Sequence, residues 1–123
     1  MNRTILLAED EDDVRDLLGD YLGSRGHAVL PAANGASALA LSRSFGGSID
    51  LLLTDVIMPA MTGLDLAHHV QRERPGIEVV FMSGYAPRLA ELRASGCPSA
   101  AFLAKPFSLR ALDAAVQGLL ARA

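Results

Sequence analysis

The sequence predicts an α/β fold: a doubly wound, five-stranded parallel sheet with helices on both faces. Short apolar runs of strand length recur along the chain, and segments of helical length separate them. The runs are nearly continuously apolar, which is typical of parallel strands buried on both faces. Strands that alternate with helices in this way are joined by right-handed crossovers. The 123 residues, 50% of them hydrophobic, suit one domain over residues 1–123 with a sizeable core.

The first strand is predicted at Thr4–Ala8, directly before the consecutive acids of residues 9–13. The helix after these acids has one apolar face at helical spacing, formed by Val14, Leu17, Leu18, Tyr21 and Leu22. The second strand is predicted at Ala28–Ala32. It contains Pro31, which has no N–H to donate to a neighbouring strand, so we expect it at an edge of the sheet. This edge position favours the strand order 2-1-3-4-5.

The third strand is predicted at residues 51–55, where Asp55 closes an apolar run and Pro59 directs the chain into a loop. Among the later segments, the helix predicted at residues 87–95 has the lowest apolar content, and we expect it to be the most mobile. The other elements are expected as helices at residues 36–45 and 62–74, strands at 78–82 and 100–104, and a final helix that begins after Ser108.

Polar side chains stand where four of the predicted strands end. They are Glu9 and Asp10, Asp55, Ser83 and Lys105. Because the carboxyl ends of parallel strands meet at one edge of a sheet, we expect these side chains to share a crevice. Carboxylates this close raise one another's pKa unless a cation neutralises them, and an oxygen-only ligand set suits Mg²⁺. A lysine and a hydroxyl opposite the metal complete a clamp for a phosphoryl group, with Asp55 as its nucleophile.

The same residues carry a resemblance to a known family. The motifs are Glu9-Asp10, Leu53-Thr54-Asp55-Val56-Ile57-Met58-Pro59 with Gly63, Ser83-Gly84, and Lys105-Pro106-Phe107. Over nearly its whole length the chain resembles the CheY-like receiver domain of two-component response regulators, and most of all the receivers of hybrid sensor histidine kinases. The resemblance implies a flavodoxin-like (βα)5 sandwich. It also implies a phosphorelay module in which Asp55 accepts a phosphoryl group from a histidine of a partner.

The resemblance further implies a role for each site residue. Asp10, Asp55 and the carbonyl group of Ile57 bind Mg²⁺ directly, and Glu9 binds it through water. Ser83 and Lys105 contact the phosphoryl oxygens, and the Lys105-Pro106 peptide is cis. Ser83 and Phe102 form the switch, although Phe102 lacks the hydroxyl of the tyrosine that is common there. Ile57 and Tyr85 flank the site with bulky groups, so we expect the phosphoryl group to resist self-hydrolysis.

Composition limits the other function classes. The net charge of −3 with scattered cations argues against nucleic acid and membrane partners, and the apolar stretch at residues 5–8 is too short for a leader or a membrane span. A cytoplasmic protein is therefore expected, with the single Cys97 as a loop thiol. The resemblance to receiver domains implies that the partner is a sensor histidine kinase or a histidine phosphotransfer protein. A homodimer through the fourth helix, fifth strand and fifth helix is a further arrangement to test.

The leading prediction is a binding module that catalyses only its own phosphorylation and dephosphorylation. The first alternative is a scaffold that never takes a phosphoryl group, which the intact set of acids, hydroxyl and lysine disfavours. The second is a phosphatase of the haloacid dehalogenase type, but that family usually has a second Asp where this chain has Ile57. Flavin binding is also disfavoured, since the first strand is followed by acids rather than by a glycine-rich, phosphate-binding loop.

Overall fold

The computed structural model describes residues 3–85, 90 and 100–121. These residues form one parallel five-stranded sheet in the order β2-β1-β3-β4-β5, as the sequence predicts. The strands are β1 (Thr4–Ala8), β2 (Ala28–Ala32), β3 (Leu51–Asp55), β4 (Glu78–Ser83) and β5 (Ala100–Ala104). The helices are α1 (Asp12–Ser24), α2 (Gly35–Ser44), α3 (Gly63–Glu73) and α5 (Leu109–Leu120).

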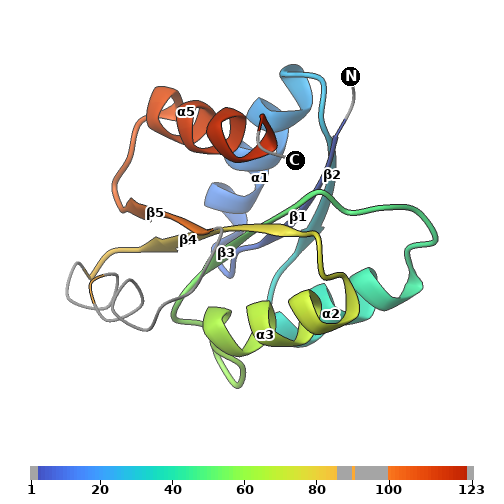
Figure 1. Ribbon diagram of the computed structural model, residues 1–123. Coiled ribbons are helices and arrows are strands. Elements are labelled where there is room, and N and C mark those ends of the chain that lie inside the picture. The colour runs from blue at the N-terminus through green and yellow to red at the C-terminus, as the bar shows by residue number, and fades with distance from the viewer. Residues whose placement is uncertain (1–2, 86–89, 91–99, 122–123) are drawn as a thin grey trace.

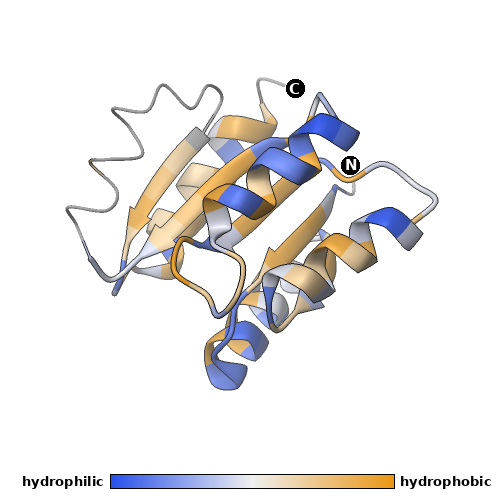
Figure 2. Ribbon diagram, turned by 90° about the horizontal axis from the view of Figure 1, so that it is seen from below, coloured by the Kyte–Doolittle hydropathy of each residue, from blue (hydrophilic) through white to orange (hydrophobic). Residues whose placement is uncertain are grey.

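The helices cover both faces of the sheet. Figure 1 shows α1 and α5 on one side and α2 and α3 on the other. Strand residues alternate between the two faces, so that Leu52 belongs to the core under α2 and α3 while Leu51 and Leu53 belong to the core under α1 and α5. Figure 2 shows the strands as mainly hydrophobic and the helices as partly hydrophilic. Each buried strand therefore contributes apolar side chains to two cores, which is why its sequence is continuously apolar.

The predicted edge strand is confirmed. β2 pairs only with β1 among the described strands, and Pro31 lies opposite Leu7 in that pair. The central β3 strand is fully buried and lies between β1 and β4. Asp55, its last residue, is thus carried at the centre of the sheet's carboxyl edge, at the point where the chain order of the strands reverses.

The predicted inner face of α1 is correct except at Leu17. Leu18 and Leu22 are buried, whereas the Leu17 side chain is 55% exposed. On a helical wheel Leu17 falls about 60° to one side of Val14, while Leu18 and Leu22 fall about 40° and 80° to the other. The buried stripe is centred on Leu18 and Leu22, so Leu17 lies outside it.

Three helices begin at side-chain caps. Asn34 accepts a hydrogen bond from the Ser37 amide before α2, and Thr62 accepts one from Asp65 before α3. Ser108 accepts one from the amide of Ala111, which confirms the predicted start of α5. Each cap satisfies an amide that the helix itself leaves unpaired.

Several predictions fall outside the described residues. Of the helix expected at residues 87–95, only Ala90 is described, and Cys97 is not described at all. The homodimer surface that includes this helix therefore stays a prediction. Among the described helices, none combines the length and the apolar composition needed to cross a membrane.

Candidate functional site

The carboxyl ends of the strands enclose a cleft of about 340 Å³. Its lining includes Asp10, Asp55, Ser83 and Lys105, which come from the ends of β1, β3, β4 and β5. Glu9 lies next to them as a neighbour of Lys105. All five side chains that the sequence places at the strand ends are thus brought together, because parallel strands in register end at the same edge.

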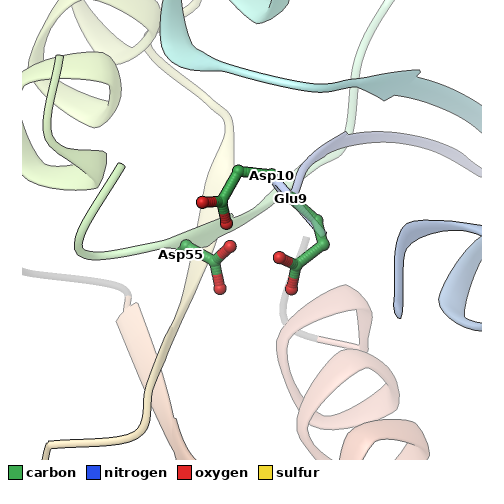
Figure 3. A group of neighbouring side chains, drawn as sticks. All are labelled: Glu9, Asp10 and Asp55. Atoms are coloured by element: carbon green, nitrogen blue, oxygen red, sulfur yellow. The ribbon is translucent and has the colours of Figure 1, made fainter. Parts of the chain in front are cut away.

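Three carboxylates lie close together in this cleft. Figure 3 shows Glu9, Asp10 and Asp55 with their carboxylates turned toward a common space. One oxygen from each lies within 4.8 Å of the others. Glu9 is fully buried and Asp55 is 4% exposed, whereas Asp10 is exposed. Two of the three negative charges are therefore shielded from solvent, where charge repulsion is strong.

Lys105 compensates part of this charge. Its Nζ lies 2.7 Å from Oε1 of Glu9 and 2.7 Å from Oδ1 of Asp55. The backbone amide of Lys105 donates to the carbonyl of Ser83 at 2.8 Å, and the Lys105-Pro106 peptide is cis, as predicted. The hydrogen bond to Ser83 holds the backbone of Lys105 at the end of β5, and the ammonium group reaches the acids that follow β1 and end β3.

The loop after β3 packs closely against Asp55. The amide of Val56 donates to the carbonyl of Met82 at 2.9 Å, and the amide of Gly63 donates to the carbonyl of Val56 at 2.7 Å. A Cβ at Gly63 would overlap the carbonyl oxygen of Asp55. Ala60 turns this loop in the left-handed region, with φ of 69°. Only glycine at position 63 lets α3 begin this near Asp55.

The charges around Asp55 set the pKa values of the cluster. Burial, and then the adjacent Glu9 carboxylate, raise the pKa of Asp55 to about 8 despite Lys105. Burial alone would raise the pKa of Glu9, but hydrogen bonding with Asp55, Lys105 and the Glu11 amide lowers it below its ordinary value. Burial and mutual repulsion therefore favour one shared proton on the Glu9–Asp55 pair when no cation is bound.

The cluster fits a small divalent cation. Oδ2 of Asp55 is buried and has no hydrogen-bond partner among the described residues. An orphaned buried carboxylate oxygen is costly unless an ion or a proton satisfies it. The donors are all oxygens, and Asp10 is open to solvent, which suits an ion such as Mg²⁺ that keeps several waters. Glu9, Asp10 and Asp55 could hold such an ion.

The remaining predicted site residues lie around this cluster. The Ser83 hydroxyl accepts a hydrogen bond from the amide of Tyr85 at 3.1 Å and lines the cleft. Ile57 and Tyr85 line it as well, with side chains 58% and 55% exposed. Phe102 is half-buried and stacks on Phe81, with ring centroids 5.9 Å apart. Phe102 therefore packs with the core under α2 and α3, beside the sheet edge rather than in the cleft.

Sequence reasoning missed Arg15. Its guanidinium group donates to the carbonyl of Glu9 at 3.0 Å and to Oδ1 of Asp12 at 2.6 Å. A signal was present, since Arg15 is the first cation after the run of acids at residues 9–13. Its spacing of three residues from Asp12 is the spacing of a helical ion pair. The contact with the Glu9 carbonyl could not be read from spacing.

We expect Asp55→Asn to stabilise the metal-free protein, and more so at pH 8 than at pH 6. The folded pKa of about 8 lies above the ordinary aspartate pKa of 3.8. The bound proton therefore contributes stability that is fully present below pH 4 and is lost as the pH rises toward 8. Asparagine does not titrate, so the variant does not lose this stability as the pH rises. The difference in unfolding free energy between Asp55→Asn and the wild type therefore grows with pH.

Urea denaturation in EDTA at both pH values measures this difference. Asp20→Asn, at an exposed position of α1, is the control and should show no comparable pH dependence. A gain for Asp55→Asn that is equal at pH 6 and pH 8 would contradict the raised pKa.

A family model and individual relatives both match this chain to receiver domains. The family model described as response regulator receiver domain matches residues 5–117. The sensor kinase CckA of Brucella abortus is 39% identical over 117 residues, 95% of this chain. The response regulator receiver protein CpdR of the same species is 36% identical over 118 residues, 96% of this chain and 97% of its own length. The chain spans only 12% of the CckA kinase.

Solved structures agree with the sequence comparison. The crystal structure of the receiver domain of hybrid histidine kinase CckA has a TM-score of 0.82 and 36% identity, and the match covers 95% of this chain and 98% of that one. The response regulator TrrA of Thermotoga maritima, crystallised with Mg²⁺-BeF, has a TM-score of 0.79 and 26% identity, with the same coverage. Both share the arrangement of sheet and helices described above.

Proposed function

The chain belongs to the response regulator receiver domain family, and on that premise we propose that it accepts a phosphoryl group from a partner's phosphohistidine onto Asp55. One observation carries the proposal. The Asp55 carboxylate closes the central strand, with one oxygen 2.7 Å from the Lys105 ammonium and the other buried with no partner in the described part of the chain. A nucleophile for phosphoryl transfer needs a free oxygen together with nearby cationic groups. Asp55 has a free oxygen, and Lys105 is one nearby cation.

In the proposed transfer, a carboxylate oxygen of Asp55 bonds to phosphorus as the bond from phosphorus to the partner's imidazole nitrogen breaks. The electron pair of the broken bond stays on that nitrogen, which can then bind a solvent proton. Lys105 lies where it can contact an oxygen of the group on Asp55, and we assign it the stabilisation of that charge. The hydroxyl of Ser83, which lines the same cleft, is assigned a second contact.

We assign the metal to the acids of the same cleft. Asp10, Asp55 and the carbonyl group of Ile57 would bind Mg²⁺ directly, and Glu9 would bind it through water. When bound, Mg²⁺ would neutralise the carboxylates and the charge on the phosphoryl oxygens. Because Asp55 must lose its proton to attack, Lys105 and the bound cation both favour its reactive form.

The partner is proposed to be a sensor histidine kinase or a histidine phosphotransfer protein. The relatives include a receiver protein of nearly the same length and a kinase of which the matched region is a small part. Both arrangements suit a module that passes a signal by changing its binding to other proteins. The output would follow from a shift between two conformations, with Ser83 and Phe102 as the proposed switch residues.

The test is the intact mass after incubation with acetyl phosphate, with and without Mg²⁺, for the wild type and Asp55→Asn. We expect a gain of one phosphoryl group that requires Mg²⁺ and that the variant lacks. The same experiment with a purified histidine phosphotransfer protein covers a strict requirement for a protein donor. No gain from either donor would favour a scaffold that is never phosphorylated.

We also propose that the phosphoryl group persists, because Ile57 and Tyr85 flank the site with bulky groups and the Ile57 side chain has no polar atom to orient an attacking water. Replacing Ile57 with asparagine should speed the loss of label roughly tenfold, below the full effect of a positioned general base. The measurement is the decay of the phosphorylated protein in Mg²⁺. Ile57→Val is the control, since it keeps the rim apolar and should leave the decay rate close to that of the wild type. An unchanged rate for Ile57→Asn would contradict this proposal.

A further inference from the structure

The Arg15 side chain is largely covered, although its ion-pair partner is exposed to solvent. Arg15 lies in the first turn of α1, where its backbone amide donates to the carbonyl of Glu11 at 2.9 Å. Its side chain is only 18% exposed, whereas that of Asp12, its ion-pair partner, is 82% exposed. An arginine that served only to pair with a solvated aspartate would itself be solvated. The covered guanidinium points to a further role, at the carbonyl of Glu9.

The Glu9 carbonyl belongs to the peptide unit that joins the two consecutive acids of the site. Because a peptide unit is planar, holding this oxygen restricts the backbone rotation on both sides, at Glu9 and at Asp10. The other contacts of Glu9 do not act on this unit. Its amide donates to the carbonyl of Ala32, and its side chain accepts from the Glu11 amide and from Lys105. Within the described residues, Arg15 is the side chain that holds the Glu9–Asp10 peptide.

We propose that Arg15 is a positioning residue that orients the carboxylates of Glu9 and Asp10 for a divalent cation. This inference rests on the proposed function. According to this inference, Arg15 increases the affinity for Mg²⁺, whereas its positive charge alone would decrease that affinity. A cation beside a metal site repels the metal, so if charge were its main effect, removing Arg15 would tighten binding. If orientation is the main effect, removing Arg15 weakens binding.

The experiment is a calorimetric titration of the metal-free protein with MgCl₂. We expect both Arg15→Ala and Arg15→Lys to weaken Mg²⁺ binding about tenfold, the lower range for loss of a group that orients metal ligands. The lysine variant keeps the charge but cannot bond to the Glu9 carbonyl and to Asp12 with the same two-point geometry. Arg43→Ala is the matched control, because Arg43 is a 57% exposed arginine that pairs with Glu73 away from the site. It should leave the affinity unchanged.

Phosphorylation by acetyl phosphate then separates orientation from general damage. With Mg²⁺ well above each variant's dissociation constant, the Arg15 variants should recover nearly the wild-type rate, since their defect is in metal affinity. Rates that stay low at saturating Mg²⁺, or an Arg15→Ala variant that binds Mg²⁺ as tightly as the wild type or more tightly, would overturn the inference. So would a wild type that binds no Mg²⁺.

The two proposals can fail separately. A wild type that binds Mg²⁺ but takes no phosphoryl group would remove the proposed function, while the effect of Arg15 on affinity would stand. A wild type that is phosphorylated, with Arg15 variants of unchanged affinity, would remove only the role of Arg15.

Discussion

Gly63→Ala is expected to abolish most phosphoryl uptake and to lower the melting temperature by roughly 10 °C. The added Cβ would overlap the backbone carbonyl of Asp55, and also approach the backbone of Val56. A backbone group cannot rotate away as a flexible side chain can, so β3 and α3 must move apart. Overpacking of this severity costs about 3 kcal/mol, which corresponds to that change in melting temperature for a domain of this size.

The loss of uptake follows from the displacement of Asp55, the proposed nucleophile. A shift of about 1 Å at a reacting group can reduce a rate by about 10²-fold. Thermal unfolding and the mass assay with acetyl phosphate measure the two effects. Gly19→Ala is the matched control, since no atom lies within 4 Å of its added Cβ and the position is within α1. That variant should be more stable by about 0.5–1 kcal/mol and should be phosphorylated normally. Normal stability and uptake in Gly63→Ala would show that the loop is not held as described.

The sheet and its order could be predicted because they depend on patterns that the sequence states directly. Continuous apolar runs identify strands buried on both faces, and Pro31 identifies an edge. The site followed from the same topology, since parallel strands place their last residues at one edge. Asp55 and Lys105 are fifty residues apart in sequence and 2.7 Å apart in the structure for this reason.

The features that could not be predicted depend on the rotation of a helix about its axis and on side-chain conformation, rather than on the order of the strands. The spacing of apolar residues in α1 shows that a buried stripe exists, but it does not fix the centre of that stripe, so Leu17 was placed wrongly. Spacing likewise cannot show that the Lys105 ammonium contacts two acids at once, or that the Arg15 guanidinium reaches back to a backbone carbonyl. These contacts are set by side-chain rotamers, which the packing of neighbouring elements selects.

Lys105→Met is expected to reduce phosphoryl uptake about 10²-fold while tightening Mg²⁺ binding. Lys105 is the one lysine in the sequence, and its Nζ lies 2.7 Å from both Glu9 and Asp55. Methionine keeps an unbranched side chain of similar length but removes the charge. Glu9 and Asp55 then lack the cation that pairs with them, and Mg²⁺ is attracted more strongly to the cluster. The phosphoryl group loses a charged hydrogen bond, and a loss of that kind typically costs about 10²–10³ in rate.

The opposite signs make this variant informative. If Lys105 served only to balance charge in the metal-free cluster, saturating Mg²⁺ would replace it and uptake would return to the wild-type rate. If Lys105 contacts the phosphoryl oxygens, the rate stays low however much Mg²⁺ is bound, because a bound metal would not replace the hydrogen bond of the ammonium group. Calorimetry with MgCl₂ and the mass assay at saturating Mg²⁺ measure the two quantities. Arg110→Met, which removes an exposed cation from α5, should change neither. Full recovery of uptake in Lys105→Met would therefore leave Lys105 with a purely structural role.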